Sequence, residues 1–475
     1  MSRINTNVAS LYAQEGLARS QGSLNTTLQR LSTGLRINSG ADDPSGLIAS
    51  QQLKAEMAGI STAVDNSQRA NNVIQTAEGA LNEVSSLLQS VKGLIVQAAN
   101  TGAMSSDEIA ANQLQLDSAV QSITRISETT TFAGLHLIDG SLDYLTSGLN
   151  TTAIQSLDVS QASFGTNASV PVSVDVLTSA RTAAMEFTGS SIGNSVSLEI
   201  TGNTGTQTLT FTSGTAASAI AYAVNTVSDS TGVTAKPINP AVATSGIVFS
   251  SSGYGSQSFV SVQAQTGTFK TVDTKGNAES RVVGRDAVAT VNGALTTGTG
   301  LELKLNTSSL DLDLTLNKNF GAGKTSFAIT GGGALFQLGS QVASNQQVSI
   351  GIGSVAANKL GNGDVGFLSD VSTGGSASLV SGNAAAASNI IDAAITQVSV
   401  LSGRLGAFQT DTLDTNINSL SVALENVTSA NSTIADADFA EETANLTRAQ
   451  ILVQAGTSVL STANSTPQSV LKLLQ

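Results

Sequence analysis

The sequence of 475 residues contains no cysteine and no tryptophan, and His136 is its only histidine. Without cysteine, the chain has no disulfide, no thiolate metal site and no cysteine nucleophile. A single histidine also excludes metal sites that need two imidazole ligands. Most chemistry based on these two residue types is therefore closed to this protein.

Charged residues are also scarce, at 12% against about 25% in an average globular domain. The 34 acidic side chains outnumber the 21 basic ones, which gives a formal net charge of −13. Because nucleic-acid binding needs a basic face, this balance argues against a nucleic-acid partner. No run approaches the ~18–20 apolar residues of a membrane span, and the first thirty residues lack the ~7–15-residue apolar core of a secretory signal. We expect no membrane insertion and no cleavable signal.

Glycine and aromatic residues divide the chain into three parts. Residues 146–375 hold 30 of the 45 glycines and 12 of the 17 aromatic residues. The two ends, 1–145 and 376–475, are poor in both. This distribution predicts helical ends and a middle of strands and turns.

The N-terminal end carries a long apolar seam with 4-3 spacing between 53 and 98. The seam positions include Leu53, Met57, Ile60, Val64, Ile74, Leu81, Val84, Leu88, Val91 and Ile95. A helix of these 46 residues, at ~1.5 Å rise each, is a rod about 70 Å long that needs partners along its whole length. Ser105 and Glu108 have the spacing of a capping box that begins a second helix, over about 105–131.

The C-terminal end supplies a matching seam that begins at Ile391 and slips after Leu405. The slip predicts a stutter, which locally unwinds a supercoil. Beyond it the seam continues through Leu413, Ile417, Leu420, Leu424 and Val427. The simplest packing brings both ends together as a long antiparallel helical bundle, with a β-rich α+β part inserted between them. From periodicity alone, an ordinary helical-bundle core is the alternative interpretation.

The extreme termini, 1–43 and 437–475, carry further apolar stripes but no obvious partner within the chain. Short amphipathic helices are marginal alone, so we expect these segments to be disordered in the monomer and ordered on assembly. Frayed termini without a role are the alternative.

Several long motifs resemble bacterial flagellin. They are LSTGLRINSGADDPSGL at 31–47, EGALNEVSSLLQSVKGLIVQAAN at 78–100, TTFAGLHLIDG at 130–140 and the final segment from Asn445. Their order and their distances from the termini match that family, whose members polymerise into the flagellar filament for swimming motility. The resemblance implies a filament core made by terminal residues of many subunits, here Leu24, Leu28, Leu31, Leu35, Val459, Leu460, Leu471, Leu473 and Leu474.

The resemblance also implies a connector between core and rod at Asp42, Asp43, Pro44 and Gly46. Proline suits a loop or a helix start, and glycine at position 46 permits an unusual backbone angle. A metal or acid pair at Asp42 and Asp43 lacks a third ligand nearby, so a helix N-cap is the favoured interpretation.

The family's biology implies the remaining partners and the location. Flagellins leave the cell unfolded through the flagellar type III secretion system, with a cytoplasmic export chaperone on the C-terminal segment. Hook-associated junction and cap proteins are the expected neighbours of the homopolymer, in an extracellular filament. The expected domains are a terminal core (1–43 and 437–475), a rod (44–178 and 376–436) and an inserted outer domain (179–375).

Alternating apolar residues predict strands within the insertion, including 196–200, 209–211, 301–305 and 310–316. A short helix at 220–227 interrupts them. Residues 186–262 resemble the IN motif of some flagellin and hook-associated insertions.

The residue patterns that could indicate an enzyme or a bound ion do not have the spacing that such sites need. Gly321–Thr325 imitates the end of a phosphate-binding loop, but the required first glycine would fall at Lys318. Asp311 and Asp313 share a strand face without a following calcium-loop pattern, which favours a solvated face. We expect no catalytic, cofactor-binding or metal-binding residues, and no enzyme.

Many flagellins present a rod-helix patch to a Toll-like receptor. Gln89, Leu94 and Gln97 match this patch, whereas Ser90 and Leu114 stand where those flagellins have Arg and Glu. Loss of the arginine removes a bidentate anchor, so we expect weak or absent recognition.

Two other functions were weighed. A hook–filament junction protein shares related ends, but the match at 130–140 and over the last thirty residues favours flagellin. Adhesion by the insertion is compatible with the sequence and stays open.

Overall fold

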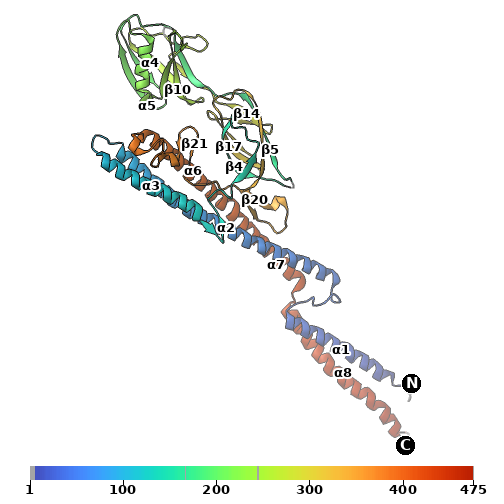
Figure 1. Cartoon of the computed structure of the whole chain (residues 1–475). Helices are drawn as coiled ribbons and strands as arrows, with labels where there is room; N and C mark the ends of the chain where they lie inside the picture. The colour runs from blue at the N-terminus through green and yellow to red at the C-terminus, as the bar shows by residue number, and fades with distance from the viewer. Residues whose placement is uncertain (1–5, 166, 243–244, 474–475) are drawn as a thin grey trace. The chain divides into compact units, whose positions relative to one another are not determined.

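The computed structural model describes residues 6–165, 167–242 and 245–473, with the backbone alone at 297 and 467–473. Long helices occupy both ends of the chain, and antiparallel sheets occupy the middle (Figure 1). The fold class expected from the sequence is thereby confirmed. The chain divides into two compact units. The terminal unit comprises Met1–Arg69, Gln337–Val342 and Thr410–Gln475, and the central unit comprises Ala70–Phe336 and Ala343–Gln409.

The described helices are as follows. They are α1 (Val8–Thr33), α2 (Pro44–Ala98), α3 (Ser106–Thr129), α4 (Ala217–Thr226), α5 (Ser228–Thr231), α6 (Ala384–Ala407), α7 (Thr415–Ala435) and α8 (Phe439–Leu473). The predicted rod helix begins nine residues before its first seam position, because Pro44 and an N-cap at Asp43 start it. Ser105 and Glu108 form the predicted capping box of α3.

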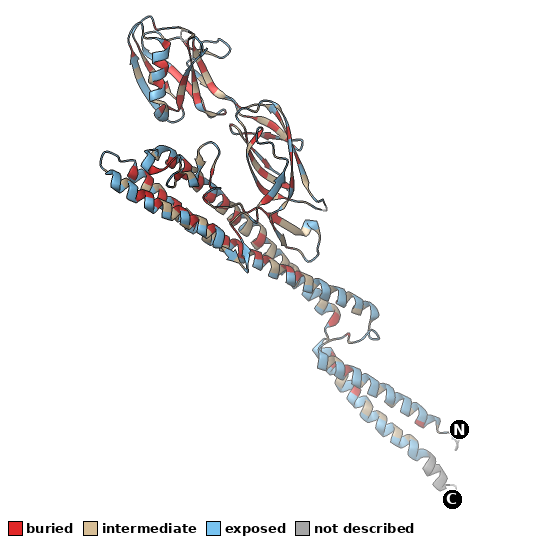
Figure 2. Cartoon of the chain, in the orientation of Figure 1, coloured by how far each residue is buried: buried red, intermediate tan, exposed pale blue. Residues whose placement is uncertain are grey.

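Within the central unit, the α2 seam is fully buried. Ile74, Leu81, Val84, Leu88, Val91 and Ile95 are each at most 1% exposed, and they share this interior with Leu116 and Ile123 of α3 and with Ile391 and Val398 of α6. Figure 2 shows this buried stripe. Burying a large apolar side chain is worth about 1.5–3 kcal/mol, so the seam stabilises the rod along this stretch.

The slip after Leu405 is a π-helical segment, Phe408–Asp414, rather than a supercoil stutter. Leu405 and Leu413 are both fully buried although eight positions separate them. In an α-helix that spacing leaves the two side chains about 80° apart around the axis. Wider i→i+5 turns rotate less per residue, which returns Leu413 to the buried side.

The strands of the middle part are short and antiparallel. Those before the α4 helix are β1 (Thr131–Phe132), β2 (Leu135–His136), β3 (Tyr144–Ser147), β4 (Ile154–Ala162), β5 (Val170–Thr178), β6 (Thr182–Phe187), β7 (Val196–Thr201) and β8 (Thr206–Phe211). Those after it are β9 (Val233–Pro237), β10 (Ile247–Tyr254), β11 (Phe259–Thr266), β12 (Val272–Asp273), β13 (Arg281–Val283), β14 (Val288–Val291), β15 (Ala294–Thr297), β16 (Glu302–Asn306), β17 (Leu310–Leu316), β18 (Gly323–Gly332), β19 (Ala334–Gln337), β20 (Gln347–Ile350), β21 (Gly361–Asn362) and β22 (Gly366–Phe367).

These strands build two modules with separate hydrophobic cores. The first β module combines the sheets β15-β14-β5-β18-β3 and β16-β17-β4 around residues such as Val174, Leu312 and Ile329. The second β module combines β12-β6-β10-β9 and β13-β11-β7-β8 with α4, around residues such as Leu198 and Phe249. The second module includes the segment that resembles the IN motif.

One arginine joins α6 to the first β module. The Arg404 guanidinium donates to the Ser160 hydroxyl of β4, lies 3.4 Å from an Asp158 carboxylate oxygen, and donates to the Gly351 carbonyl at 3.1 Å. Three segments far apart in the sequence therefore meet at one side chain.

By length and mean hydropathy alone, the continuous helical stretch Ala384–Ala435 passes a threshold for spanning a membrane. The sequence of this stretch contains no continuous apolar run of that length, because small and hydroxyl residues interrupt the strongly apolar positions. Ile390, Ile391, Ala394, Val398 and Leu405 of this stretch are buried inside the protein. A core helix passes the same threshold, and the buried residues indicate that role here.

We predict that Leu81→Ala lowers the free energy of unfolding by about 2–5 kcal/mol, because it leaves a cavity in the closed part of the seam. The matched variant Leu53→Ala, at a half-buried seam position, should cost clearly less. Denaturant titration followed by circular dichroism measures both. Equal losses would show that the two stretches of α2 are packed alike.

Candidate functional site

The two terminal helices form an antiparallel pair, with α1 beside α8 (Figure 1). Near one end the Asn7 side chain donates to the Ala463 carbonyl at 2.8 Å, and the Ser10 hydroxyl donates to Asn464 at 2.7 Å. Near the other end Arg30 pairs with Glu442 at 2.9 Å. These contacts fix the register of the pair.

Only one face of each terminal helix is used in the pair. On α1 the covered residues recur at 3-4 spacing, at Ser10, Ala13, Leu17, Ser20, Leu24, Thr27 and Leu31. On α8 the equivalent residues are Leu446, Ala449, Val453, Gly456, Leu460 and Ala463. Small residues on this face let the helices approach closely, and Leu17 lies against Gly456.

A second set of apolar side chains on the same helices faces solvent. It comprises Val8, Leu11, Tyr12 and Leu28 on α1 and Phe439, Ile451, Leu452 and Val459 on α8. Tyr12 is 72% exposed and Phe439 is 73% exposed. Figure 2 shows both helices as mostly exposed. We call this set the outer stripe.

The predicted core residues fall on both faces of the pair. Leu24, Leu31 and Leu460 are half-buried between the helices, and Leu35 is half-buried in the following connector. Leu28 and Val459 belong to the outer stripe. Leu471 and Leu473 are in α8 but their side chains are not described, and Leu474 lies outside the described residues.

Sequence reasoning missed Tyr12, Phe439, Ile451 and Leu452 as surface-forming residues. The predicted set mixed positions of both faces, such as Val459 and Leu460, and did not separate the covered face from the exposed one. The signal was available, because Ile451 and Leu452 lie off the 3-4 series that runs through Ala449, Val453 and Gly456.

The rod seam also changes character within the terminal unit. Ile60 is buried, but Leu53, Met57 and Val64 of α2 and Ile417, Leu420, Leu424 and Val427 of α7 are only half-buried. The two helices are held together by hydrogen bonds from Ser50 to Asn431 at 2.8 Å and from Asn416 to Ser67 at 3.0 Å. Leu413, at the end of the π-helical segment, is fully buried.

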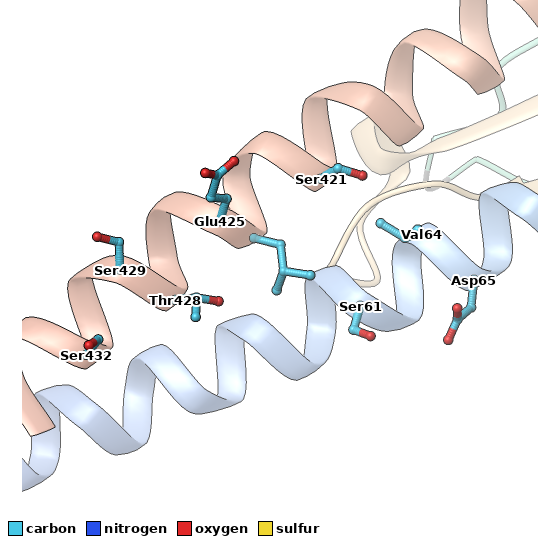
Figure 3. Close-up of a pocket in the computed structure, with 9 residues that line it drawn as sticks. Ser61, Val64, Asp65, Ser421, Glu425, Thr428, Ser429 and Ser432 are labelled. Carbon is cyan, nitrogen blue, oxygen red and sulfur yellow. The ribbon is translucent and has the colours of Figure 1, made fainter. Parts of the chain in front are cut away.

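A groove of about 590 Å³ lies between α2 and α7 (Figure 3). Val64 and Leu424 give it an apolar floor, and the hydroxyl residues Ser61, Ser421 and Thr428 line its sides. Asp65 and Glu425 point away from each other on its outside (Figure 3). The groove is the place where the half-buried seam residues remain accessible.

The two connector segments of the terminal unit pair with each other. Leu35 and Asp436 form an antiparallel bridge, in which the Arg36 amide donates to the Ala435 carbonyl at 2.7 Å and the Ala437 amide donates to the Gly34 carbonyl at 2.9 Å. Gly34 ends α1 in a left-handed conformation, at φ 72°. The N-terminal and C-terminal connectors therefore form one joint.

Asp42 and Asp43 have different tasks in the connector. Asp43 accepts a hydrogen bond from the Gly46 amide at 2.9 Å and caps the start of α2 at Pro44. Asp42 instead accepts from the amides of Asn38 and Ser39, at 3.1 and 2.8 Å, and closes the preceding loop. The hydrogen bonds from Ser39 and from Gly46 hold the pKa of Asp42 and of Asp43, respectively, below the usual carboxyl value.

Gly46 does not use the unusual backbone angle that glycine permits. Gly46 is in the first turn of α2 and is not among the residues with positive φ. A Cβ at this position would lie 2.6 Å from Ile37 Cδ1 and would also meet the Asp43 carboxylate. Glycine therefore leaves room for the cap and for the buried Ile37.

The residues of the expected receptor patch lie on two helices of the central unit. Gln89, Ser90 and the half-buried Leu94 are on α2, and the exposed Leu114 is on α3. A hydrogen bond of 3.3 Å from Asn112 to Gln97 joins the helices beside them. In the part of the chain that the structure describes, no group of three His, Cys, Asp or Glu side chains is arranged to hold a metal ion.

We predict that the start of α2 loosens in acid. Because Asp42 and Asp43 have lowered pKa values in the folded chain, their contribution to stability is present above the usual carboxyl pKa and is lost as the pH falls through the lowered values. The protection of the Gly46 amide, measured as its exchange rate relative to the intrinsic rate at the same pH, should therefore fall in this acid range, and in Asp43→Ala at neutral pH. The control Glu56→Gln, at an exposed position of the same helix, should leave it unchanged. Equal exchange in Asp43→Ala and the unaltered chain would contradict the capping role.

Comparison with known proteins identifies the family to which the chain belongs. The bacterial flagellin N-terminal helical region matches residues 4–143, and the bacterial flagellin C-terminal helical region matches residues 388–474. The chain is 31% identical to the B-type flagellin of Pseudomonas aeruginosa over 533 aligned residues and 31% identical to the flagellin of Salmonella typhimurium over 502, with 99% of each chain covered in both cases. Among solved structures, FliC from Burkholderia pseudomallei shares 15% identity and a TM-score of 0.26, over 72% of this chain and 98% of that one. The chain therefore belongs to the bacterial flagellin family, and it is a structural subunit of the extracellular flagellar filament rather than an enzyme.

Proposed function

We propose that this subunit polymerises through its paired terminal helices, with the outer stripe of each copy packed against neighbouring copies. The observation that carries the proposal is the set of large apolar side chains that the described part of the pair exposes. Full burial of one such side chain is worth about 1.5–3 kcal/mol, so eight of them supply a strong drive for association.

The half-buried seam between α2 and α7 is a second contact surface in this proposal. Its positions continue the spacing of the closed seam, yet the terminal unit leaves them half-exposed around the groove. A neighbouring copy in the filament completes their burial. The expected division into a terminal core, a rod and an inserted outer domain rests on the same distinction, and its boundaries remain predictions.

We further propose the export route and partners that the family implies. The chain passes unfolded through the flagellar type III secretion system, and an export chaperone covers the C-terminal segment before secretion. The outer stripe on α8 supports this, because four exposed apolar side chains on one helix would otherwise promote early assembly in the cytoplasm. Hook-associated junction and cap proteins contact the two ends of the homopolymer.

We predict that Tyr12→Ser and Ile451→Ser abolish filament growth from purified protein seeded with salt, as seen by electron microscopy. Deletions of 1–35 or 440–475 should have the same effect. Both substituted side chains are exposed, so circular dichroism and thermal unfolding of the monomer should stay unchanged.

The control for this experiment is Tyr222→Ser, the same substitution at an equally exposed tyrosine on α4. It should assemble like the unaltered chain. Normal filaments from Tyr12→Ser and Ile451→Ser would exclude the outer stripe as the assembly surface. Compact monomers from every version, the unaltered chain included, would contradict assembly by the purified chain altogether.

We propose that Toll-like receptor recognition is weak, because Ser90 and Leu114 replace the arginine and glutamate of recognised flagellins. Both positions are exposed, so substitution there does not disturb the rod core. A receptor reporter assay should give a low response to the unaltered chain and a higher response to Ser90→Arg with Leu114→Glu. A strong response to the unaltered chain would overturn this proposal.

A further inference from the structure

The two β modules of the central unit are connected by two chain segments that pair with each other. Arg181, just before β6, and Arg285, just after β13, form an isolated antiparallel bridge. The Arg181 amide donates to the Arg285 carbonyl at 2.8 Å, and the Arg285 amide donates to the Arg181 carbonyl at 2.9 Å. Two short strands alone form a narrow joint, which by itself leaves the angle between the modules free to vary.

Asp286 follows this bridge directly, and its carboxylate reaches both modules. One oxygen accepts hydrogen bonds from the Ser256 amide at 2.9 Å and from the Gly300 amide at 2.8 Å, and the other accepts from the Ser256 hydroxyl. Ser256 is in the turn between β10 and β11 of the second module. Gly300 is in the turn between β15 and β16 of the first module.

Two further features support the contact between these turns. Tyr254, at the end of β10, packs against the hydrophobic core of the first module. Gly255 has a positive φ of 99°, and a Cβ at this position would lie 2.7 Å from the Gly300 Cα. The absence of a side chain here lets the two turns approach closely enough to share one carboxylate.

We propose that Asp286 is a latch that fixes the orientation of the second β module on the first. A charged acceptor with three donors from two turns makes stronger hydrogen bonds than neutral groups do. The bridge between Arg181 and Arg285 connects the modules, and Asp286 with Tyr254 sets the angle between them. The orientation of the second β module is then set by contacts outside the helical rod.

Single-molecule energy transfer tests the latch on the full-length chain. The chain has no cysteine, so Tyr222→Cys on α4 and Leu145→Cys on β3, both at exposed positions, give one labelled pair across the two modules. Single-molecule concentrations keep the protein monomeric, so the result does not depend on the proposed assembly surface. We expect a narrow distribution of energy-transfer efficiency for the chain with Asp286, and a broadened or shifted distribution for Asp286→Ala.

Asp273→Ala is the matched control. Asp273 is likewise half-buried and accepts hydrogen bonds from two amides, those of Lys275 and Asn277, each at 2.8 Å. These partners lie within one turn of the second module. Removal of the Asp273 carboxylate should therefore leave the distribution of energy-transfer efficiency unchanged. Identical distributions for Asp286→Ala and Asp273→Ala would overturn the proposal.

Hydrogen exchange supplies a second readout and a check on folding. In Asp286→Ala the amides of Ser256 and Gly300 should exchange faster, whereas amides within β7 and β17 should stay protected. If β7 or β17 loses protection, Ser256→Ala takes over the test, since it removes one donor and keeps the carboxylate. A broadened distribution in that variant supports the latch, and an unchanged one overturns it.

Discussion

The burial of one continuous seam on α2 is the interaction on which the rest of the structure depends. The α2 helix has 55 residues, and its own hydrogen bonds and helix propensities are not enough to keep a helix of this length stable. It is stable because neighbouring segments cover its apolar stripe. From Ile74 to Ile95 the neighbours are α3 and α6, and the seam is closed. From Leu53 to Val64 the seam faces α7 and is mostly half-buried, and a groove remains between the two helices. The seam of α2 is therefore buried within the subunit along one stretch and only half-buried along the other.

The terminal helices α1 and α8 also leave apolar side chains exposed within the single subunit. Their inward faces combine small and hydroxyl residues such as Ser10, Thr27 and Ala449 with half-buried leucines. Further large apolar residues, Tyr12 and Phe439 among them, are on the outside. The pair therefore leaves exposed large apolar side chains that a closed helical hairpin would bury. A subunit that is stabilised by its neighbours in a polymer has a physical reason for this distribution, because marginal pairing in isolation keeps assembly dependent on other copies.

Periodicity made the helical part of this fold predictable, because helices repeat locally. The seam of α2, the capping box at Ser105 and the alternation of Leu310–Leu316 all depend on residues within a few positions of each other. The π-helical segment was visible only as a slip after Leu405, since spacing shows that register changes but not which backbone geometry absorbs the change. No strand was predicted between 144 and 178, although β3, β4 and β5 lie there. Their partners are β14, β17 and β18, more than a hundred residues later, and no local pattern in 144–178 reveals that pairing.

The joints of the molecule were hidden from sequence reasoning for the same reason, and they use charged side chains, which are scarce in this chain. Charged side chains make up 12% of the sequence. Partial burial of such a side chain costs desolvation free energy, which its hydrogen bonds and ion pairs must offset. Arg30 meets Glu442 across 412 positions, and Arg404 meets Asp158 across 246. Asp286 meets Ser256 across 30. In each case a charged group connects separate elements of the structure. Apolar burial is not directional, whereas a charge with fixed hydrogen-bond donors is satisfied in one geometry only. In this subunit apolar seams therefore supply the stability, and a few isolated charges set the angles at which its parts are joined.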